Sequence, residues 1–222
     1  MLVYGAAGAF GSGGVTLNGG GISVGSGLTF TNPLTFSGSA IVLGGNGTFG
    51  SAITVDSHVV LSPGNSPGNI TFSAGLTLAS GGAISFQVYD ANGPAGTGYD
   101  LITVSGGVLA LTASSNTITF NLLSIDSSSN AGNAINFNAG TNYSWVFATS
   151  PGSLITGFNA SQFHLVNGFT NNLSGGFFTF SQSLDQHSLL LNFTAVPEPS
   201  TWALLLTGVG AVAVISRRRR RA

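Results

Sequence analysis

Apolar and polar residues alternate through most of this chain, beginning at Val15. Apolar side chains two positions apart are typical of a strand that buries one face. The pairs are Ile22/Val24, Leu28/Phe30, Leu34/Phe36, Ile41/Leu43, Ile53/Val55, Val59/Leu61, Ile70/Phe72, Leu76/Leu78 and Ile84/Phe86. Gly, Asn, Ser and Pro, which favour turns, separate the pairs. The pattern therefore predicts an all-β body, with no amphipathic helix before residue 200.

The spacing of the pairs suggests how these strands are arranged. Pairs that start at 22, 28, 34 and 41 are too close together for hairpins of ordinary strands. Comparable starts return after about 17 to 19 residues, as from 22 to 41, 34 to 53, 41 to 59 and 59 to 76. Three short strands in each cycle predict a β-solenoid (parallel β-helix-like) over residues 15–124, with stacked coils around an apolar interior. An antiparallel β-sandwich is the alternative, because it also has regular strand and turn signals.

The two ends of this region have a different character. Residues 1–14 contain no basic side chain, and Gly5 and Gly8 interrupt their apolar run, so they make a poor secretory signal. We expect an unstructured start there, from a misplaced first codon or a fragment of a longer precursor; cytosolic residence is the alternative.

After Ile125 the regular spacing of the strand pairs is lost. Residues 125–195 are predicted to form a β-region that caps the open end of the body.

Charge is scarce and unevenly placed along the chain. Only 5% of residues are charged, no cysteine is present, and the five basic side chains other than histidine are Arg217–Arg221. A body without Lys or Arg lacks the phosphate contacts that dominate nucleic-acid affinity. We therefore expect no nucleic-acid partner. The lack of cysteine excludes disulfides, a thiolate nucleophile and cysteine-based metal sites.

Two glycine motifs resemble catalytic or nucleotide-binding signatures. Residues 64–68 match G-x-S-x-G, but Pro67 and a strand pattern follow, whereas a nucleophile elbow needs a helix. Residues 45–50 match G-x-G-x-x-G, but another strand pattern follows, so no helix N-terminus could hold a pyrophosphate. Both motifs are interpreted as turns between strands.

The acidic residues give little support for catalysis or metal binding. Asp90, Asn92 and Asp100 could offer oxygen ligands to a cation, but they lack the dense spacing of calcium loops. Asp56 and His58 can share one face of a strand, with no apparent nucleophile nearby. A glycosidase needs two carboxylates close together, and the aspartates are scattered at 56, 90, 100, 126 and 185. We expect no enzyme activity, no cofactor and no metal site, and a glycan-active enzyme is the second alternative.

Residues 60–112 carry a resemblance to a known class of repeat. LSPGNSPGNITFSAGLTLASGGAISFQV, followed by GYDLITVSGGVLAL, is similar to the passenger-type β-strand repeats of autotransporter-like surface proteins. The resemblance implies a secreted, extended, non-catalytic stalk or adhesin-like body. A carbohydrate-binding or adhesive module is the first alternative function, in which exposed Tyr89, Tyr99, Tyr143 or Trp145 would stack on sugars.

The C-terminus has the composition of a membrane anchor. Residues 200–216 contain no charge, and as a helix they would span about 26 Å, close to the thickness of a bilayer core. The anchor residues are Trp202, Leu204, Leu205, Leu206, Val209, Val212, Val214 and Ile215. Arg217, Arg218, Arg219, Arg220 and Arg221 then act as a stop-transfer cluster that stays in the cytoplasm. We predict a single transmembrane helix in membrane lipid, with the body outside the cytoplasm.

The segment before this anchor completes a recognisable signal. Val196, Pro197, Glu198 and Pro199, followed by STWALLL, an apolar run and the arginines, resemble the PEP-CTERM sorting signal over residues 196–222. The resemblance implies cleavage by an exosortase, a membrane transpeptidase of Gram-negative bacteria, and an association with exopolysaccharide and biofilm matrix. We therefore expect an exported structural protein, anchored at first and then located at the cell surface or outside the cell.

Overall fold

The structure, a computed structural model, describes residues 1–197 together with Leu204 and Thr207. The strands are β1 (Leu2–Tyr4), β2 (Val15–Leu17), β3 (Gly21–Val24), β4 (Thr29–Phe30), β5 (Leu34–Phe36), β6 (Ile41–Gly45), β7 (Thr48–Phe49), β8 (Ile53–Val55), β9 (Val59–Pro63), β10 (Asn69–Phe72), β11 (Leu76–Leu78), β12 (Ala83–Val88), β13 (Leu101–Val104), β14 (Leu109–Leu111), β15 (Ile118–Ser124), β16 (Tyr143–Thr149), β17 (Phe163–Gly168), β18 (Phe177–Gln182) and β19 (Ser188–Thr194). One 3-10 turn, η1 (Ala160–Gln162), precedes β17. The prediction of an all-β body with parallel sheets is confirmed.

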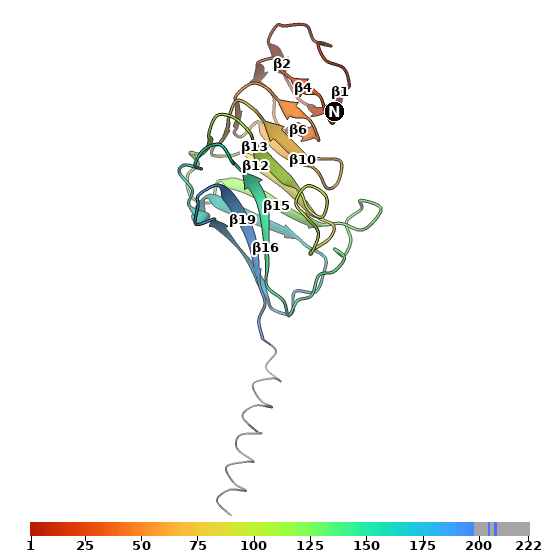
Figure 1. Cartoon of the computed structure of the whole chain (residues 1–222), viewed down its shortest axis with the longest axis vertical. Coiled ribbons are helices and arrows are strands. Elements are labelled where there is room, and N and C mark those ends of the chain that lie inside the picture. The colour runs from red at the N-terminus through yellow and green to blue at the C-terminus, as the bar shows by residue number, and fades with distance from the viewer. Residues whose placement is uncertain (198–203, 205–206, 208–222) are drawn as a thin grey trace, which may run out of the picture.

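The strands form two large sheets and two small ones. One large sheet has the order β1-β3-β6-β9-β12-β15-β17, and the other has the order β18-β19-β16-β13-β10-β7-β4. The small sheets are β14-β11-β8 and β2-β5. From β3 to β14, each turn of the chain places one strand in each large sheet and a third in one of the small sheets. The coils therefore stack from the N-terminal end to the end where the chain leaves the body (Figure 1). Named strands between residues 2 and 124 pair in parallel, unlike those of the antiparallel sandwich alternative.

The predicted pitch is right for the early coils and wrong for the later ones. Ile41 pairs with Val59 as expected, whereas Val60 pairs with Ala83 rather than with the strand at residue 76. Leu76 instead pairs with Ile53 and with Leu109, which are 23 and 33 residues away. The later coils are longer because both their corner loops and their strands lengthen: β12 and β15 have six and seven residues, whereas β3 has four.

The first strand corrects a prediction about the N-terminus. Leu2–Tyr4 forms β1 and pairs in parallel with β3, where the sequence led us to expect no structure. Tyr4 is buried, and its ring lies edge-on to Phe30 with centroids 5.1 Å apart. A strand this short gives no periodic signal, and the edge of the next coil supplies its hydrogen-bond partners.

The C-terminal β-region first extends the stack and then ends it. β16 pairs in parallel with β13, and β17 pairs in parallel with β15. Only β19 is reversed, pairing antiparallel with both β16 and β18. This reversal ends the parallel repeat at the point where the chain leaves the body.

Stacking in register places similar residues above one another. The rings of Phe30, Phe49 and Phe72 form an inward line, with neighbouring centroids 6.0 and 5.6 Å apart. On the outward side, a threonine row runs across β4, β7, β10, β13 and β16. Its members are Thr29, Thr48, Thr71, Thr103 and Thr149, each paired with the next. Cross-strand threonine pairs stabilise a sheet, so the row has a structural role at least.

Candidate sorting site

The folded body ends immediately before the predicted sorting tripeptide. Thr194, the last residue of β19, still pairs with Phe177 of β18. The backbone N–H of Ala195 then donates a hydrogen bond of 2.8 Å to Oδ1 of Asn142. Val196 and Pro197 are exposed. Two residues therefore separate the last strand from Pro197, while Glu198 and Pro199 lie outside the described residues.

The loop that holds Ala195 is itself fixed to the core. The Tyr143 hydroxyl accepts a hydrogen bond of 2.8 Å from the backbone N–H of Asn138 and donates one of 3.0 Å to the carbonyl of Asn136. The Phe137 ring stacks on Tyr143 and lies edge-on to Phe193 of β19, at 5.3 and 5.0 Å. The loop before β16, which bonds to the chain just after its last strand, is therefore itself fixed by hydrogen bonds and ring contacts.

A hollow of about 510 Å³ surrounds this exit. We call it the exit groove, and it is lined by Asn138, Ala139, Gly140, Asn142, Ser174, Ala195, Val196 and Pro197. Its side chains are amides, a hydroxyl and small apolar groups, with no charge among them. The groove was not predicted from sequence, because its walls come from three segments that only the fold brings together.

Most of the predicted membrane anchor lies outside the described residues. This applies to Trp202, Leu205, Leu206, Val209, Val212, Val214, Ile215 and Arg217–Arg221. Leu204 and Thr207 are described, both are helical, and the Thr207 hydroxyl donates a hydrogen bond of 3.0 Å to the Leu204 carbonyl. Within the described part of the chain, no helix has the length and hydropathy that a membrane span requires.

The two glycine motifs lie at corners between strands, as predicted. Gly45 has a φ of +93°, and a Cβ on it would lie 2.2 Å from the Val24 carbonyl oxygen of the coil before. Strand β7 follows this motif. Gly64 and Gly68 approach each other so closely that a Cβ on either would collide with the other, and β10 follows. Glycine is required here by close backbone contact, which accounts for the motifs without a ligand.

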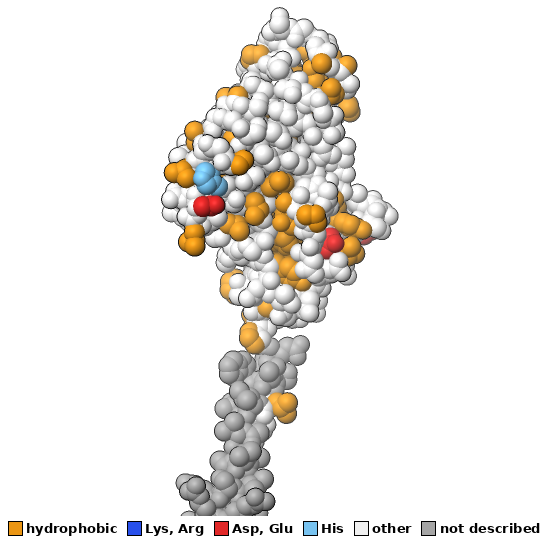
Figure 2. Space-filling view, viewed as in Figure 1, with side chains coloured by type: hydrophobic (Ala, Val, Ile, Leu, Met, Phe, Trp, Pro, Cys, Tyr) orange, Lys and Arg blue, Asp and Glu red, His pale blue; other side chains and the backbone are white. Residues whose placement is uncertain are grey.

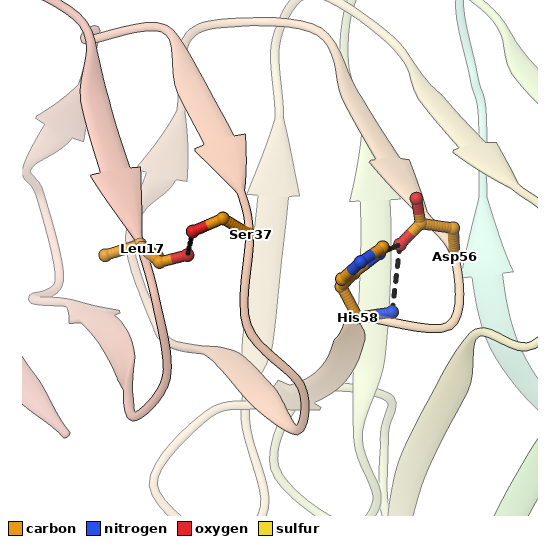
Figure 3. A network of polar contacts seen from close by, with 4 residues as sticks. All are labelled: Leu17, Ser37, Asp56 and His58. Atoms are coloured by element: carbon orange, nitrogen blue, oxygen red, sulfur yellow. Dashed lines mark hydrogen bonds and ion pairs between the residues drawn. The ribbon is translucent and has the colours of Figure 1, made fainter.

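Asp56 and His58 do come together, in the turn between β8 and β9 (Figure 3). Oδ1 of Asp56 lies 2.9 Å from Nδ1 of His58 and accepts a 3.0 Å hydrogen bond from the His58 backbone N–H. Partial burial acts to raise the pKa of Asp56, but the bonds to His58 outweigh it and leave this pKa below its usual value. Within residues 1–197 the ring has no other hydrogen-bond partner. The pair stabilises a turn. In the same view, the Ser37 hydroxyl donates a hydrogen bond to the Leu17 carbonyl of the neighbouring coil (Figure 3).

The loop considered for a cation does not gather its oxygens. Asp90 accepts hydrogen bonds from the Asn92 backbone and the Asn136 side chain. Asp100 is 1% exposed, and its two carboxylate oxygens each accept a 2.9 Å bond, from the backbone N–H groups of Gly68 and Gln87. Burial raises the pKa of Asp100 to about 8 against the opposing effect of these two bonds. Among the described residues, no cluster of three or more His, Cys, Asp or Glu could hold a metal.

The aromatic residues considered for sugar stacking are mostly part of the core. Trp145 is 2% exposed and donates a hydrogen bond of 2.9 Å to the Ala91 carbonyl. Tyr99 and Tyr143 are buried too, and Tyr89 is half-buried. The first alternative function requires these side chains to be exposed, and three of the four are not. Figure 2 shows apolar side chains in several separate places on one face, with a histidine and acidic groups and no Lys or Arg among the described residues.

Comparison with known proteins identifies the C-terminal segment. A family model described as the PEP-CTERM protein-sorting motif matches residues 195–221, starting at the residue that Asn142 holds. This match supports exosortase-dependent sorting, which entails export and anchoring through the C-terminus. No family match shows the autotransporter-like character predicted for residues 60–112. No curated protein and no solved structure matches the chain.

Proposed function

We propose that this chain is a structural protein of the cell surface or extracellular matrix of a Gram-negative bacterium, with a β-solenoid body that an exosortase sorts. The observation that carries the proposal is the sorting motif at residues 195–221, which starts at the residue directly after the last strand. Before processing, the apolar segment would sit in membrane lipid with the arginines on the cytoplasmic side. The body itself has no Lys or Arg, which disfavours a nucleic-acid partner.

The contacts of the acidic groups support a non-catalytic role for the body. Asp56 and Asp185 each bond within a local turn, and Asp126 accepts bonds from the backbone N–H groups of Ser128 and Asn130. Asp90 and Asp100 bond to different partners, as described above. Asp185 also accepts a bond from the Ser183 hydroxyl of the same turn, and none of these contacts pairs two carboxylates as glycoside hydrolysis requires.

The threonine row favours an association with exopolysaccharide over a purely inert body. Its members recur at the strand spacing of about 4.8 Å. Within the described residues, the hydroxyls of Thr29, Thr48 and Thr71 have no hydrogen-bond partner, whereas Thr103 donates to the Asn69 side chain and Thr149 to the His187 carbonyl. An uncharged row of free hydroxyls suits a hydroxyl-rich polymer.

Removing two hydroxyls from the row tests this association. The double variant Thr48→Val, Thr71→Val keeps the branched shape. We expect it to bind polysaccharide from the native host about five- to thirtyfold more weakly, because each of the two lost hydrogen bonds contributes about 0.5 to 1 kcal/mol. Co-sedimentation with the insoluble polymer measures the change. Thr112→Val, at an exposed threonine outside the row, is the control. Equal binding by all three proteins would argue for an inert body.

Processing at the tripeptide tests the sorting function itself. Wild-type chain from its native host should lose the residues that follow the cleaved bond, which intact-mass analysis detects. Glu198→Gln should reduce the processed fraction by about tenfold or more, because a bond to a charged group contributes about 1.5 to 3 kcal/mol. Asp185→Asn makes the same acid-to-amide change on the body and should be processed normally. A wild-type chain that stays intact in its host would contradict the sorting function.

A further inference from the structure

The start of the sorting motif and the wall of the exit groove share residues. Ala195, Val196 and Pro197 belong to the matched motif and also line the groove. We propose that the exit groove is a docking surface for the sorting enzyme, and that Asn142 positions the motif for cleavage. The inference rests on the proposed function, since it concerns the same enzyme and the same cleavage.

The short distance between the body and the tripeptide supports this docking. Thr194 is still bonded within the sheet, so only Ala195 and Val196 lie between the last strand and Pro197. Two or three extended residues reach at most about 10 Å. An enzyme that encloses the tripeptide must therefore meet the end of the body, and the groove is the surface that it meets.

The chemistry of the groove fits a protein partner. Asn142 uses its carbonyl oxygen to hold Ala195, and Asn138 uses its own to hold the backbone of Gly140. Their amide N–H₂ groups and the Ser174 hydroxyl have no partner within the described residues, and all three line the groove. Uncharged donors and acceptors of this kind suit the backbone and polar side chains of a protein loop. A lipid surface would be favoured by basic side chains, and residues 1–216 contain no Lys or Arg.

The positioning role of Asn142 can be tested with a pair of substitutions. Asn142→Ala removes the bond to Ala195, and we expect processing in the native host to slow about fivefold, as for the loss of one hydrogen bond. Asn142→Asp keeps the acceptor for the Ala195 N–H but lacks the amide N–H₂ group. We expect it to restore most of the rate, because the bond to Ala195 is what positions the motif. Asn65→Ala, at an exposed asparagine far from Asn142 in the sequence, is the control. The thermal midpoint of each full-length variant shows whether the fold is intact.

A change in spacing tests the same idea without substituting any residue of the groove. Inserting Gly-Ser-Gly-Ser between Thr194 and Ala195 adds roughly 13 Å of reach and should also lower the rate of processing. If both Asn142→Ala and the insertion are processed at the wild-type rate, the inference is wrong while the sorting function stands. If the wild-type chain is not processed either, the proposed function fails as well, so the two failures are distinguishable.

Cross-linking identifies what occupies the groove. A photo-reactive residue in place of Ser174 in the full-length chain should form an adduct of protein size with the exosortase in host membranes. The same group at position 65 should form none. Adducts with lipid alone at position 174 would overturn the docking proposal in favour of a membrane-facing surface.

Discussion

Replacing Phe120 with alanine is expected to lower the free energy of unfolding by about 4 kcal/mol, the middle of the range for phenylalanine in a packed core. Phe120 lies in β15, is 0% exposed and contacts four other rings. Its partners are Phe86, Phe147, Phe163 and Phe180, with centroids 5.0 to 6.2 Å away. The ring thus joins strands of both large sheets to the closing strands, and its loss leaves a cavity that those strands cannot fill.

Urea unfolding of the full-length chain in mild detergent, followed by far-ultraviolet circular dichroism, measures this effect. Phe177→Ala removes the same atoms from a side chain that is 52% exposed, and should cost less than about 1 kcal/mol. Phe120→Leu should fall between the two, because leucine fills part of the space. Equal losses for Phe120→Ala and Phe177→Ala would mean that the ring cluster does not hold the closing strands to the coils.

The stability of the body is expected to decrease as the pH rises from about 4 to about 8, because of Asp100. Burial raises the pKa of Asp100 from its usual 3.8 to about 8, so the folded chain keeps a proton that the unfolded chain has released. Between these two pKa values the folded state binds one more proton, and its advantage decreases by about 1.4 kcal/mol for each pH unit. The stabilising contribution of Asp100 is fully present below the lower pKa and is lost once the pH reaches the upper pKa. The free energy of unfolding changes by several kcal/mol in total between these two pH values.

Asp100→Asn should abolish this slope, because the amide does not titrate. Its stability near pH 5 should fall by about 1 to 3 kcal/mol, since one of the backbone N–H groups of Gly68 and Gln87 would lose its acceptor. Asp185→Asn is the matched control. Hydrogen bonds from Ser183 and His187 lower the pKa of Asp185, so this group titrates below about pH 4 in both states and should not change the slope between about pH 4 and about pH 8. Urea midpoints at half-unit steps of pH measure the slope. Identical slopes for wild type and Asp100→Asn would show that Asp100 is ionised in the folded state.

Parts of the candidate site could be found from sequence and parts could not. The Pro-Glu-Pro tripeptide, the apolar run and the arginines are adjacent in the chain, so their order alone gave the motif that the family match supports. Asn142 precedes Ala195 by 53 residues, and no local pattern marks it as the group that holds the exit. Asp100 was considered as a surface ligand because its neighbours are loop residues, yet the loop folds back and buries it.

The sequence by itself determined the strand character, the inward face of most strands after Val15 and the sorting signal, because these depend on periodicity and on contiguous residues. It indicated the early coil length through the return of similar pairs, as for Ile41 and Val59. Only the tertiary structure decided which strands pair in the longer coils, the place of Leu2–Tyr4 in a sheet, and the reversal of β19. Those outcomes depend on contacts between segments far apart in the chain, where loops of variable length remove the regular spacing on which a sequence prediction relies.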